Sequence, residues 1–374
     1  MQIDAVFLVE LIYDAPKFYP LSLTTPLPLV ICGGLRLAEQ AYLRTRDSAE
    51  NKDVELVQVV RPHLAVDWER IIPGLLLRDL LNVDLRLITV SYRDLERVLS
   101  RYDNAVILPA TALPSTKDVD VCRARLKNLG TRDLLDLAEK YRGRKIETIC
   151  GLLRDNVSLL EETLRMLQCD KCLVVESEVD QGVKVEKPCV LYRCTVRPFT
   201  IVRAGTVAYP HSVIGGEVKN SIIDVYSHKE HHGYLGDSYV GRFANLGAGT
   251  TTSNLKNTRG TIKYLGLDTG IRKLGSVIGD FVKTSVGTYI YSGKCVGPYS
   301  HVYHVVDIDV PPCTIYRGGR RTRMILEKLL QFIERDCARY LVDVELEKKI
   351  AVRVYWGTRI LYESSLQDLA FKLK

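Results

Sequence analysis

The stretch Thr206-Val-Ala-Tyr-Pro-His-Ser-Val-Ile-Gly-Gly-Glu-Val-Lys-Asn-Ser-Ile-Ile223 decides the fold of the larger part of this chain. Its apolar residues recur about every six residues, separated by glycine and small polar residues, and this period is typical of a β-helix. Helices disfavour so many β-branched residues and glycines, whereas a β-helix points apolar side chains into a prism and turns at small residues. We therefore predict stacked β-helix coils over residues 169–318, with a β-sandwich as the alternative.

The same spacing continues beyond this stretch. The apolar positions that carry it are Val240, Leu246, Val277, Ile278, Val282, Val286, Ile290, Val296 and Val302. We expect each of them to face the interior of the prism, because coils bury a core only by stacking on one another. The polar, glycine-rich segment 255–273 interrupts the period, and we expect it to leave one corner of the prism as a loop.

The flanking parts of the chain have other patterns. Residues 1–130 alternate apolar strands with helical stretches, which predicts an α/β domain with a largely parallel sheet. The expected elements there are strands over Ala5–Val9, Asp53–Val60 and Ala105–Pro109 and a helix over Leu35–Thr45. Residues 131–168 predict a helical connector. Residues 319–374 predict a C-terminal helical extension, and its expected elements are a helical stretch over 320–347, an edge strand over Lys349–Trp356 and a short helix over Ser365–Leu373.

The composition is that of an ordinary globular chain. Of 374 residues, 46% are hydrophobic and 26% charged, and no apolar run approaches the ~20 residues that cross a bilayer. The N-terminal Met1-Gln-Ile-Asp has no basic segment of a secretory signal, so we expect a cytoplasmic protein with no membrane partner. A net charge of +7 is modest for this length, and we expect no nucleic-acid partner. Abundant Lys, Glu and Arg beside three methionines favour a heat-adapted source.

Ten cysteines are many for such a chain. Cys169-Asp-Lys-Cys172 has the spacing of half a zinc site, but no second pair accompanies it. Cys189 and Cys194 lie close together further along the chain. We expect structural disulfides or buried thiols rather than a metal site, since intracellular disulfides occur in heat-adapted proteins.

The segment Ser227–Lys256 contains the side chains best suited to catalysis. It contains three of the seven histidines, His228, His231 and His232. Histidine is the side chain whose ordinary pKa suits proton transfer near neutral pH. Glycines occur in the same segment at about the six-residue period of the coils. A titratable cluster therefore coincides with the repeat.

Four stretches together resemble the acetyltransferase half of a bifunctional bacterial family. That family couples a glucosamine-1-phosphate N-acetyltransferase to an N-acetylglucosamine-1-phosphate uridylyltransferase, and its divergent archaeal and Bacteroidetes members are the more similar. The stretches are His231-His-Gly-Tyr234-Leu-Gly-Asp237-Ser, Asn245-Leu-Gly-Ala248-Gly-Thr, Ser253-Asn254-Leu-Lys256 and Gly279-Asp-Phe-Val-Lys283-Thr-Ser-Val-Gly-Thr. The resemblance implies a left-handed β-helix that forms a homotrimer, with active sites between subunits, acetyl-CoA as acetyl donor and an amino-sugar phosphate as acceptor.

The resemblance also implies roles for single residues. His231 falls where the family has its general base, and Tyr234 and Asn245 fall where it contacts the amino sugar. Asn254 falls on a sugar-site position that is contributed across the trimer. The spacing departs from the family pattern after Asn254, so the further lysine of the sugar site is either Lys256 or Lys263. The residues expected to contact acetyl-CoA are Ala248, Gly249, Lys283, Ser285, Arg320 and Arg321.

These residue types suit acetyl transfer on physical grounds as well. A neutral histidine can remove the proton of a sugar amine as the new bond forms. Gly247-Ala-Gly249 exposes backbone N–H groups that can stabilise an oxyanion. The amides of Asn245 and Asn254 can hold hydroxyl or phosphate groups. Lysines and arginines can neutralise phosphates, although each of them can equally be a solvated surface charge.

The three histidines admit a second interpretation. The γ-class carbonic anhydrases are also left-handed β-helices and hold zinc with three histidines. The short spacings among His228, His231 and His232 do not by themselves bring three ligands together on one face of a β-helix. A zinc hydratase is therefore an alternative function, and it leaves the sugar-site motifs unexplained.

The first domain carries a weaker resemblance. Phe18-Tyr-Pro20-Leu-Ser-Leu-Thr-Thr-Pro26-Leu-Pro28 is similar to the start of a sugar-phosphate nucleotidylyltransferase. Three parts of that pattern are missing: the glycine-rich phosphate loop, a lysine at the position of Leu27, and a metal-binding Gly-Asp at the end of the strand that closes with Ala110. We predict a nucleotidyltransferase-like fold that does not run this reaction by the usual mechanism.

Three functions follow for the whole chain. The first is an N-acetyltransferase that acts on an amino-sugar phosphate, and the second is a bifunctional enzyme that also forms UDP-N-acetylglucosamine. The third is a non-catalytic scaffold that binds a sugar or nucleotide. Asp14 and Lys17 are candidate replacements for the missing parts of the first domain, and Mg²⁺ is expected only if that domain is active.

Overall fold

The computed structural model describes residues 3–11, 13–46, 54–127 and 129–360. The chain divides into two compact units, Met1–Ile149 and Cys150–Lys374. The finer boundaries expected after residues 130, 168 and 318 stay a proposal. The short helix expected over 365–373 lies outside the described residues.

The first unit is built on a five-stranded sheet with the order β5-β4-β1-β6-β7, in which all neighbours except β6 and β7 are parallel. Its strands are β1 Ala5–Val9, β4 Glu55–Val60, β5 Leu87–Ser91, β6 Asn104–Pro109 and β7 Arg123–Arg125, with a small hairpin of β2 Ile31–Cys32 and β3 Leu35–Arg36. Its helices are α1 Leu37–Thr45, α2 Leu76–Leu81, α3 Leu95–Leu99, α4 Thr116–Val121 and α5 Thr131–Glu139. The predicted α/β layer is confirmed. Helix α1 begins two residues later than expected, because Leu35–Arg36 pairs with β2 across the Gly33-Gly34 turn.

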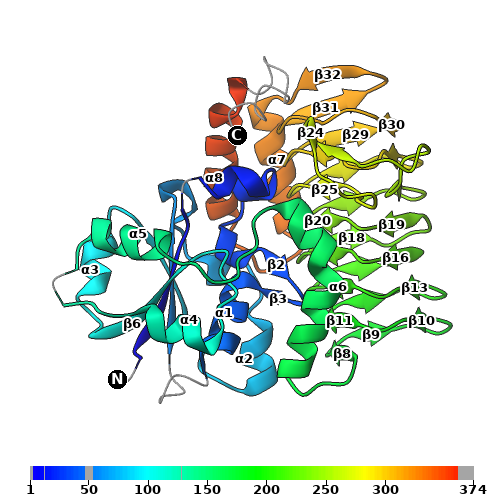
Figure 1. Cartoon of the computed structure of the whole chain (residues 1–374). Helices are drawn as coiled ribbons and strands as arrows, with labels where there is room; N and C mark the ends of the chain where they lie inside the picture. Colours follow the sequence, from blue (N-terminus) through cyan, green and yellow to red (C-terminus); the bar gives the residue numbers. More distant parts are fainter. Residues whose placement is uncertain (1–2, 12, 47–53, 128, 361–374) are drawn as a thin grey trace. The chain divides into compact units, whose positions relative to one another are not determined.

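The second unit is the expected left-handed parallel β-helix, and its strands stack on three faces (Figure 1). The first face contains β8 Cys172–Val175, β11 Cys189–Tyr192, β14 Thr206–Ala208, β17 Ile222–Ile223, β20 Tyr239–Val240, β25 Val277–Ile278 and β28 Cys295–Val296. The second contains β9 Glu178–Val179, β12 Thr195–Val196, β15 Val213–Ile214, β18 His228–Lys229, β21 Asn245–Leu246, β26 Lys283–Thr284, β29 His301–Tyr303, β31 Thr314–Arg317 and the antiparallel β32 Arg320–Arg323.

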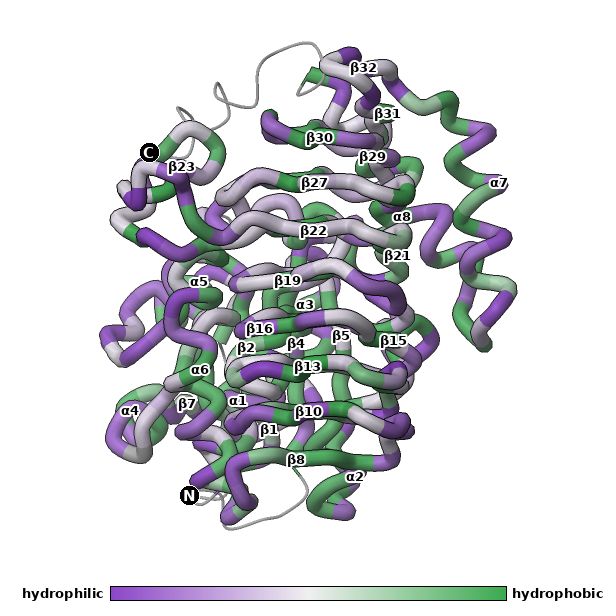
Figure 2. Tube along the Cα trace, turned by 90° about the vertical axis from the view of Figure 1, so that its right-hand side faces the viewer, coloured by the Kyte–Doolittle hydropathy of each residue, from purple (hydrophilic) through white to green (hydrophobic). Residues whose placement is uncertain are grey.

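The third face contains two short sheets that stack in one row, as Figure 2 shows. Its strands are β10 Lys184–Val185, β13 Ile201–Val202, β16 Glu217–Lys219 and β19 Tyr234–Gly236, followed by β22 Thr251–Thr252, β27 Tyr289–Ile290 and β30 Val305–Val306. Between β22 and β25 the chain leaves the prism and forms a hairpin of β23 Lys263–Tyr264 and β24 Leu267–Asp268. The loop expected over 255–273 is therefore confirmed.

The hexapeptide period places the core as predicted, with two exceptions. Val277 is buried but lies outside the apolar cluster of the prism, because side chains alternate along β25 and its neighbour Ile278 takes the inward position. Val240, Leu246, Ile278 and Val302 are buried in one continuous apolar cluster inside the prism. The prediction for Val286 is wrong, because its side chain is 72% exposed. It lies at a corner between β26 and β27, where the chain turns and the side chain points outward, so an apolar residue in the right period is not sufficient for burial.

The three corners of the prism are lined by different side chains. The aromatic corner, between the first and second faces, stacks Tyr226, Phe243, Phe281 and Tyr299 with ring centroids 4.5–5.4 Å apart. The glycine corner, between the second and third faces, is formed by the segments 215–216, 231–233, 247–249 and 286–287. The amide corner, between the third and first faces, contains Asn220, Asp237 and Asn254 in successive coils.

Three helices accompany the β-helix: α6 Ile149–Met166, α7 Leu326–Cys337 and α8 Val344–Gly357. The buried Asn156 of α6 donates to the carbonyl of Gly205 at 2.8 Å and to the amide oxygen of Asn220 at 3.0 Å, which fastens this helix to the amide corner. Phe332 of α7 packs edge-on against Phe281, so α7 covers the aromatic corner.

Two predictions for the C-terminal extension were wrong. Arg320–Arg323 is a strand, because it pairs antiparallel with β31 across the Gly318-Gly319 turn. Lys349–Trp356 belongs to helix α8 rather than to an edge strand. The alternation of the sequence there is misleading, since the residues that α8 buries recur at the three- and four-residue steps of a helix. They are Glu347, Ile350, Ala351 and Val354.

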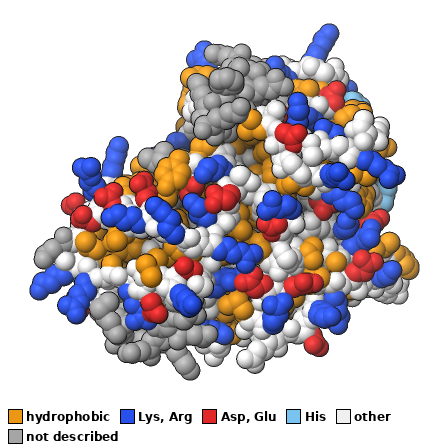
Figure 3. Space-filling model, in the orientation of Figure 1, with side chains coloured by type: hydrophobic (Ala, Val, Ile, Leu, Met, Phe, Trp, Pro, Cys, Tyr) orange, Lys and Arg blue, Asp and Glu red, His pale blue; other side chains and the backbone are white. Residues whose placement is uncertain are grey.

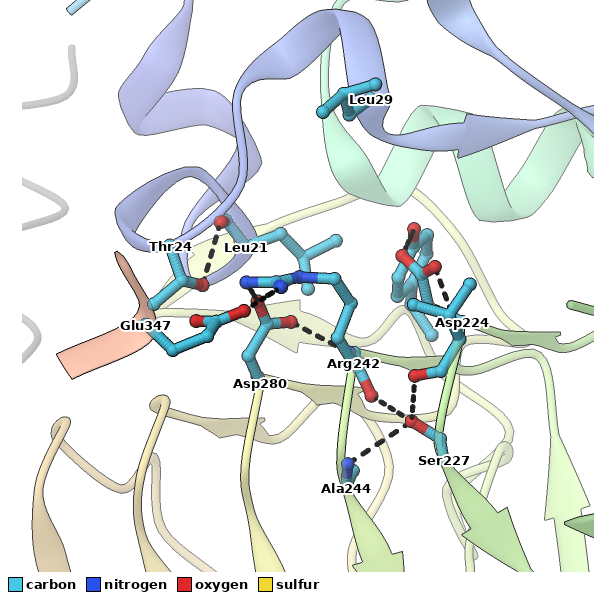
Figure 4. Close-up of polar contacts among 12 residues, drawn as sticks. Leu21, Thr24, Leu29, Asp224, Ser227, Arg242, Ala244, Asp280 and Glu347 are labelled. Carbon is cyan, nitrogen blue, oxygen red and sulfur yellow. Dashed lines mark hydrogen bonds and ion pairs between the residues drawn. The ribbon is translucent and has the colours of Figure 1, made fainter. Parts of the chain in front are cut away.

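Helix α8 is attached to the β-helix through a buried arginine (Figure 4). The guanidinium of Arg242 lies between Asp280, whose carboxylate its Nε contacts at 3.0 Å, and Glu347 of α8. Both carboxylates and the arginine are 1% exposed or less. A buried ion pair is a weak source of net stability, but removing one partner leaves an uncompensated charge. The triad therefore specifies where α8 docks.

One disulfide joins Cys172 to Cys189 across two neighbouring strands of the first face, and Cys194 is a buried thiol. These cysteines bear out the expectation of disulfides or buried thiols. The side of the molecule seen in Figure 3 intersperses Lys and Arg with Asp and Glu instead of gathering one sign. Within the described residues, no helix combines the length and apolarity that a membrane span needs.

Candidate active site

The glycine corner has its closest packing around the histidine segment 231–233. A Cβ atom added to Gly215, one coil before it, would lie 1.9 Å from the carbonyl oxygen of Glu230. One added to Gly233 would lie 2.2 Å from the carbonyl oxygen of Thr250, one coil after it. Gly233 also adopts a φ of 119°, which side chains rarely allow. The glycines therefore let three coils approach closely and leave the histidine side chains outside the prism.

Two of the three histidines lie at this corner, and both are exposed. The ring of His232 lies over Gly249, since a Cβ on that glycine would be 3.3 Å from His232 Nε2. Next to His231, Glu230 is paired with Arg197, whose Nε lies 3.0 Å from its carboxylate. Burial raises the pKa of Glu230, but Arg197 and the neighbouring histidines outweigh it and hold this pKa below its usual value.

Backbone amides face the same corner. The Gly249 N–H donates to the His232 carbonyl at 3.1 Å, and the Gly287 N–H donates to the Ala248 carbonyl at 2.7 Å. The N–H of Ala248 donates to no acceptor among the described residues. An exposed N–H beside a histidine is what an oxyanion formed at this corner would require. Ser285 lies in the next coil, against Gly247, and its hydroxyl is bonded to Thr288 at 3.1 Å.

Tyr234 and Asn254, both predicted to contact the sugar, lie against each other within one chain. The amide Nδ2 of Asn254 donates to the Tyr234 hydroxyl at 3.0 Å and to the Asp237 carboxylate at 2.5 Å. The other oxygen of Asp237 accepts from Asn220 at 2.7 Å. Because both donors of the amide point inward, the Oδ1 of Asn254 remains as an acceptor.

Tyr234 supplies the complementary group. Its hydroxyl accepts from Asn254, so its proton can be donated to a ligand. Burial, and then the charge of Asp237, raises the pKa of Tyr234, which keeps the phenol protonated. The pair therefore offers one donor and one acceptor to a hydroxylated ligand.

The two candidate lysines of the sugar site lie in different places. Lys256 borders an open hollow of about 480 Å³ with Ser253 and Tyr291, and its ammonium donates to the Thr261 carbonyl at 2.6 Å. Lys263 is exposed on the β23–β24 hairpin. Lys256 lines this hollow with Ser253, whereas Lys263 lies on the hairpin, and the charges of both lysines act on the carboxylate of Asp268.

Asn245 and Lys283 do not join this group, because they point outward from the second face. They line one small hollow with His228, Asp336 and Tyr340. The ammonium of Lys283 is paired with Asp336 of α7 and donates to the Phe243 carbonyl at 2.8 Å, while His228 Nε2 lies 3.0 Å from the Tyr340 hydroxyl. Because the Lys283 ammonium is already paired with Asp336, the expected contact with acetyl-CoA would require this ion pair to open.

Arg320 and Arg321 are exposed on β32, at the end of the second face. Three strands lie between β32 and β21, which precedes Ala248. At ~4.8 Å per strand step, about 19 Å separates these arginines from the glycine corner. Only a long ligand could contact both places.

The histidines do not form a metal site. His228 contacts Tyr340 on the second face, whereas His231 and His232 lie at the glycine corner. In the part of the chain that the structure describes, no three His, Cys, Asp or Glu side chains are close enough to hold a metal ion. The geometry of these residues therefore gives the hydratase interpretation no support.

In the first unit, the carboxylate that follows β1 is held by internal contacts. Glu10, directly after β1, is paired with Arg61 and accepts from the backbone N–H of Leu27 at 3.1 Å. Asp14 and Lys17, the candidate replacements, are paired with each other at 3.1 Å. A carboxylate thus accepts from the backbone N–H of Leu27, the position where the nucleotidylyltransferase pattern has a lysine.

Sequence reasoning missed two residues of the second unit. Asp237 orients the Asn254 amide, and the signal for it was its place within the resembling motif. Lys229 is 1% exposed, and its ammonium donates to the carbonyls of Gly215 at 3.0 Å and His231 at 2.5 Å. The signal for Lys229 was a lysine at an inward position of the hexapeptide period.

No protein-family model matches the chain. A bifunctional sugar-1-phosphate nucleotidylyltransferase/acetyltransferase of Sulfurisphaera tokodaii is 36% identical over 121 residues, which is 30% of each chain. The bifunctional protein GlmU of Thermotoga petrophila is 29% identical over 155 residues, 40% of this chain and 32% of that one. The chain thus spans 30–32% of the length of these curated relatives.

Among solved structures, a variant of perosamine N-acetyltransferase from Caulobacter crescentus in complex with CoA and GDP-perosamine is 13% identical. It covers 44% of this chain and 64% of that chain, with a TM-score of 0.19. The acetyltransferase domain of PglB from Neisseria gonorrhoeae with acetyl coenzyme A is 9% identical, covers 86% and 100%, and also has a TM-score of 0.19. Superpositions this low carry no argument, and the fold follows from the coils themselves. The sequence matches confirm the resemblance: over 30–40% of its length the chain is similar to bifunctional sugar-1-phosphate nucleotidylyltransferase/acetyltransferases.

Proposed function

We propose that this chain is an acetyl-CoA-dependent N-acetyltransferase that acts on an amino-sugar phosphate, most simply glucosamine-1-phosphate, with His231 as the general base. The observation that carries the proposal is the glycine corner. There, exposed histidines lie one coil away from an Ala248 N–H that has no acceptor among the described residues. The similarity to bifunctional sugar-1-phosphate nucleotidylyltransferase/acetyltransferases supports acetyl transfer as the reaction.

The reaction needs a base, an oxyanion donor and a sugar cradle. The neutral amine attacks the thioester carbonyl, His231 accepts the amine proton, and the tetrahedral intermediate collapses with loss of the coenzyme A thiol. The Ala248 N–H is placed to stabilise the oxyanion. In this scheme Tyr234 and Asn254, which are bonded to each other, hold sugar hydroxyls, and Lys256, which borders the neighbouring hollow, binds the phosphate.

Fewer residues remain candidates for contact with acetyl-CoA than the sequence predicted, because Lys283 is paired with Asp336. Ala248, Gly249 and Ser285 lie together at the glycine corner and remain our candidates for the thioester end of acetyl-CoA. Arg320 and Arg321 remain candidates for a phosphate contact at the far end of the second face. Asn245 fits this scheme through a neighbouring subunit, since it lies apart from Tyr234 within one chain.

We further propose a homotrimer, in the cytoplasm of a heat-adapted organism. Tyr289, Tyr291 and Val305 expose apolar surface on the third face, with 42–54% of each side chain accessible. Apolar side chains gathered on one sheet face favour contact with another subunit. Light scattering after size-exclusion chromatography would give about 127 kDa for a trimer of the 42.2 kDa chain. A mass of one chain would contradict the trimer.

The test of the activity is thiol release from acetyl-CoA. Purified protein is mixed with acetyl-CoA and glucosamine-1-phosphate, glucosamine-6-phosphate or free glucosamine, and the liberated thiol is titrated. We expect release that depends on the phosphorylated amino sugar. If no amino sugar supports release, the acetyltransferase proposal fails, and a non-catalytic scaffold becomes the favoured function.

For the first unit we propose that nucleotidyl transfer by the usual mechanism is absent. The missing parts of the sequence pattern support this proposal, together with a carboxylate, Glu10, that is paired with Arg61 and bonded to the N–H of Leu27. The test is pyrophosphate release from UTP and N-acetylglucosamine-1-phosphate with Mg²⁺. Efficient release would establish the bifunctional alternative, with Mg²⁺ as its metal.

A further inference from the structure

Lys229 occupies a position where the side chain points into the prism, although the other side chains in its row are apolar. In successive coils, strand register aligns Val196, Ile214 and Lys229, and the row continues through Leu246. Lys229 is 1% exposed, and within the described residues no carboxylate pairs with it. Lysine is almost never fully buried without a partner, because its charge loses its hydration. A position that breaks the packing rule in this way is expected at a functional site.

Two of the three N–H donors of the Lys229 ammonium are bonded to backbone carbonyls. It donates to Gly215 at 3.0 Å and to His231 at 2.5 Å. Gly215 belongs to the coil before the histidine segment, and a Cβ on Gly216 would lie 3.0 Å from the same His231 carbonyl. One cation thus joins two successive turns of the glycine corner at the residue we propose as the base. Burial lowers the pKa of Lys229 to about 8, so the group remains protonated at neutral pH.

We propose that Lys229 is a positioning residue for His231: its ammonium clamps the His231 carbonyl to the coil below and fixes the direction of the imidazole. This inference rests on the proposed function for its catalytic consequence. Its structural part, the clamp on segment 230–233, does not depend on which reaction the corner performs. Misplacement of a catalytic group by about 1 Å can cost 100-fold in rate, so such a clamp has a measurable effect.

The main variant is Lys229→Met, which keeps the length of the side chain and removes its donors. The matched control is Leu246→Met, one coil further along the same inward row, which changes packing at the same depth without touching His231. Lys229→Gln, which retains an N–H donor on a shorter side chain, is a second variant in case the first does not fold.

Two measurements are made on each protein. The first is hydrogen–deuterium exchange, followed by mass spectrometry, of the amides of Glu217 and Gly249, which donate to the carbonyls of Gly233 and His232. The second is kcat and KM for acetyl transfer, with the pH–rate profile. We expect Lys229→Met to exchange these two amides at least ~10-fold faster and to lower kcat at least ~10-fold, with KM for acetyl-CoA unchanged. Lys229→Gln should lie between wild type and Lys229→Met, and Leu246→Met should resemble wild type.

The outcomes separate this inference from the proposed function. If wild type transfers no acetyl group, the proposed function fails, and the exchange data alone decide whether Lys229 clamps the corner. Unchanged exchange in Lys229→Met overturns the clamp. Equal losses of kcat in Lys229→Met and Leu246→Met overturn the positioning role, because packing in general would then explain them.

Discussion

The glycine corner and the aromatic corner of the β-helix solve the same backbone problem with opposite side chains. Both require residues in the left-handed region: φ is 62° at Tyr226 and 57° at Phe243, and 119° at Gly233 and 76° at Gly249. For a non-glycine residue this conformation costs roughly 1–2 kcal/mol. Glycine avoids the cost, so the glycine corner needs no compensation from packing.

The aromatic corner offsets the cost by stacking. An aromatic pair contributes ~0.5–1.5 kcal/mol beyond the burial of its area, and burial of each ring adds ~2 kcal/mol or more. These gains exceed the backbone cost, but they require the rings to be covered, here by Phe332 and Tyr340. A corner that must remain accessible cannot use this solution. The glycine corner, which carries no side chains over its turns, is therefore the one where a ligand can approach the backbone.

The largest effect is expected at the glycine corner. His231→Ala should lower kcat for acetyl transfer by 10²–10⁴-fold, because a general base contributes about that much. His232→Ala is the matched control, since its ring covers Gly249 at the same corner. Steady-state thiol release measures both. A larger loss in His232→Ala than in His231→Ala would move the base assignment to His232.

A substitution in the aromatic corner should lower the free energy of unfolding and leave kcat unchanged. Phe281→Ala should lower the free energy of unfolding by about 3–5 kcal/mol, because a fully buried ring is lost from the stack. Denaturant unfolding followed by circular dichroism measures the change. At temperatures where the variant is folded, its kcat should equal that of wild type. A loss of kcat without a loss of stability would contradict the division between the two corners.

The amide corner allows a charge-swap test. Asp237→Asn removes the carboxylate that orients Asn254, and Asn254→Asp places two carboxylates at a contact of 2.5 Å. Each single change should raise KM for the amino sugar about tenfold, the effect of losing roughly one charge-assisted hydrogen bond. The double variant restores a donor facing an acceptor and leaves an acceptor toward the ligand, so its KM should return toward that of wild type. An additive double variant would show that the two side chains act independently.

The smallest effect concerns pH. Burial, and then the charge of Lys283, lowers the pKa of His301 to about 4, and its ring packs on Phe332 of α7. The pKa in the unfolded chain is about 6.5, so between these values the unfolded state binds more protons. The contribution of His301 to stability is therefore complete above pH 6.5 and is lost as pH falls toward 4.

The measurement is the unfolding midpoint of wild type and His301→Gln at several pH values. The difference between the two proteins should change between pH 6.5 and 5, with wild type losing more stability than the variant. Parallel curves would show that His301 does not take up the proton on unfolding. Lys283 and Asp336 face this histidine and are unchanged in both proteins, so their contribution cancels.

Much of the fold followed from local sequence. The six-residue period specified the coils, since inward positions such as Val240 and Leu246 must be apolar wherever coils stack. The period could not place Val286, because burial at a corner depends on the direction in which the chain turns. Alternation misled the prediction for 349–356, because tertiary contacts on Glu347 and Ile350 favour the helix.

The sequence by itself determined that a histidine, two amides and a glycine-rich segment recur on a repeating scaffold, because the repeat converts spacing into position. Only the tertiary structure decided which of them meet. Tyr234 and Asn254 lie together across two coils, whereas Asn245 and Lys283 face α7 on another side. The hexapeptide period marks Lys229 as a lysine at an inward position, but only the tertiary structure shows that its ammonium contacts the His231 carbonyl.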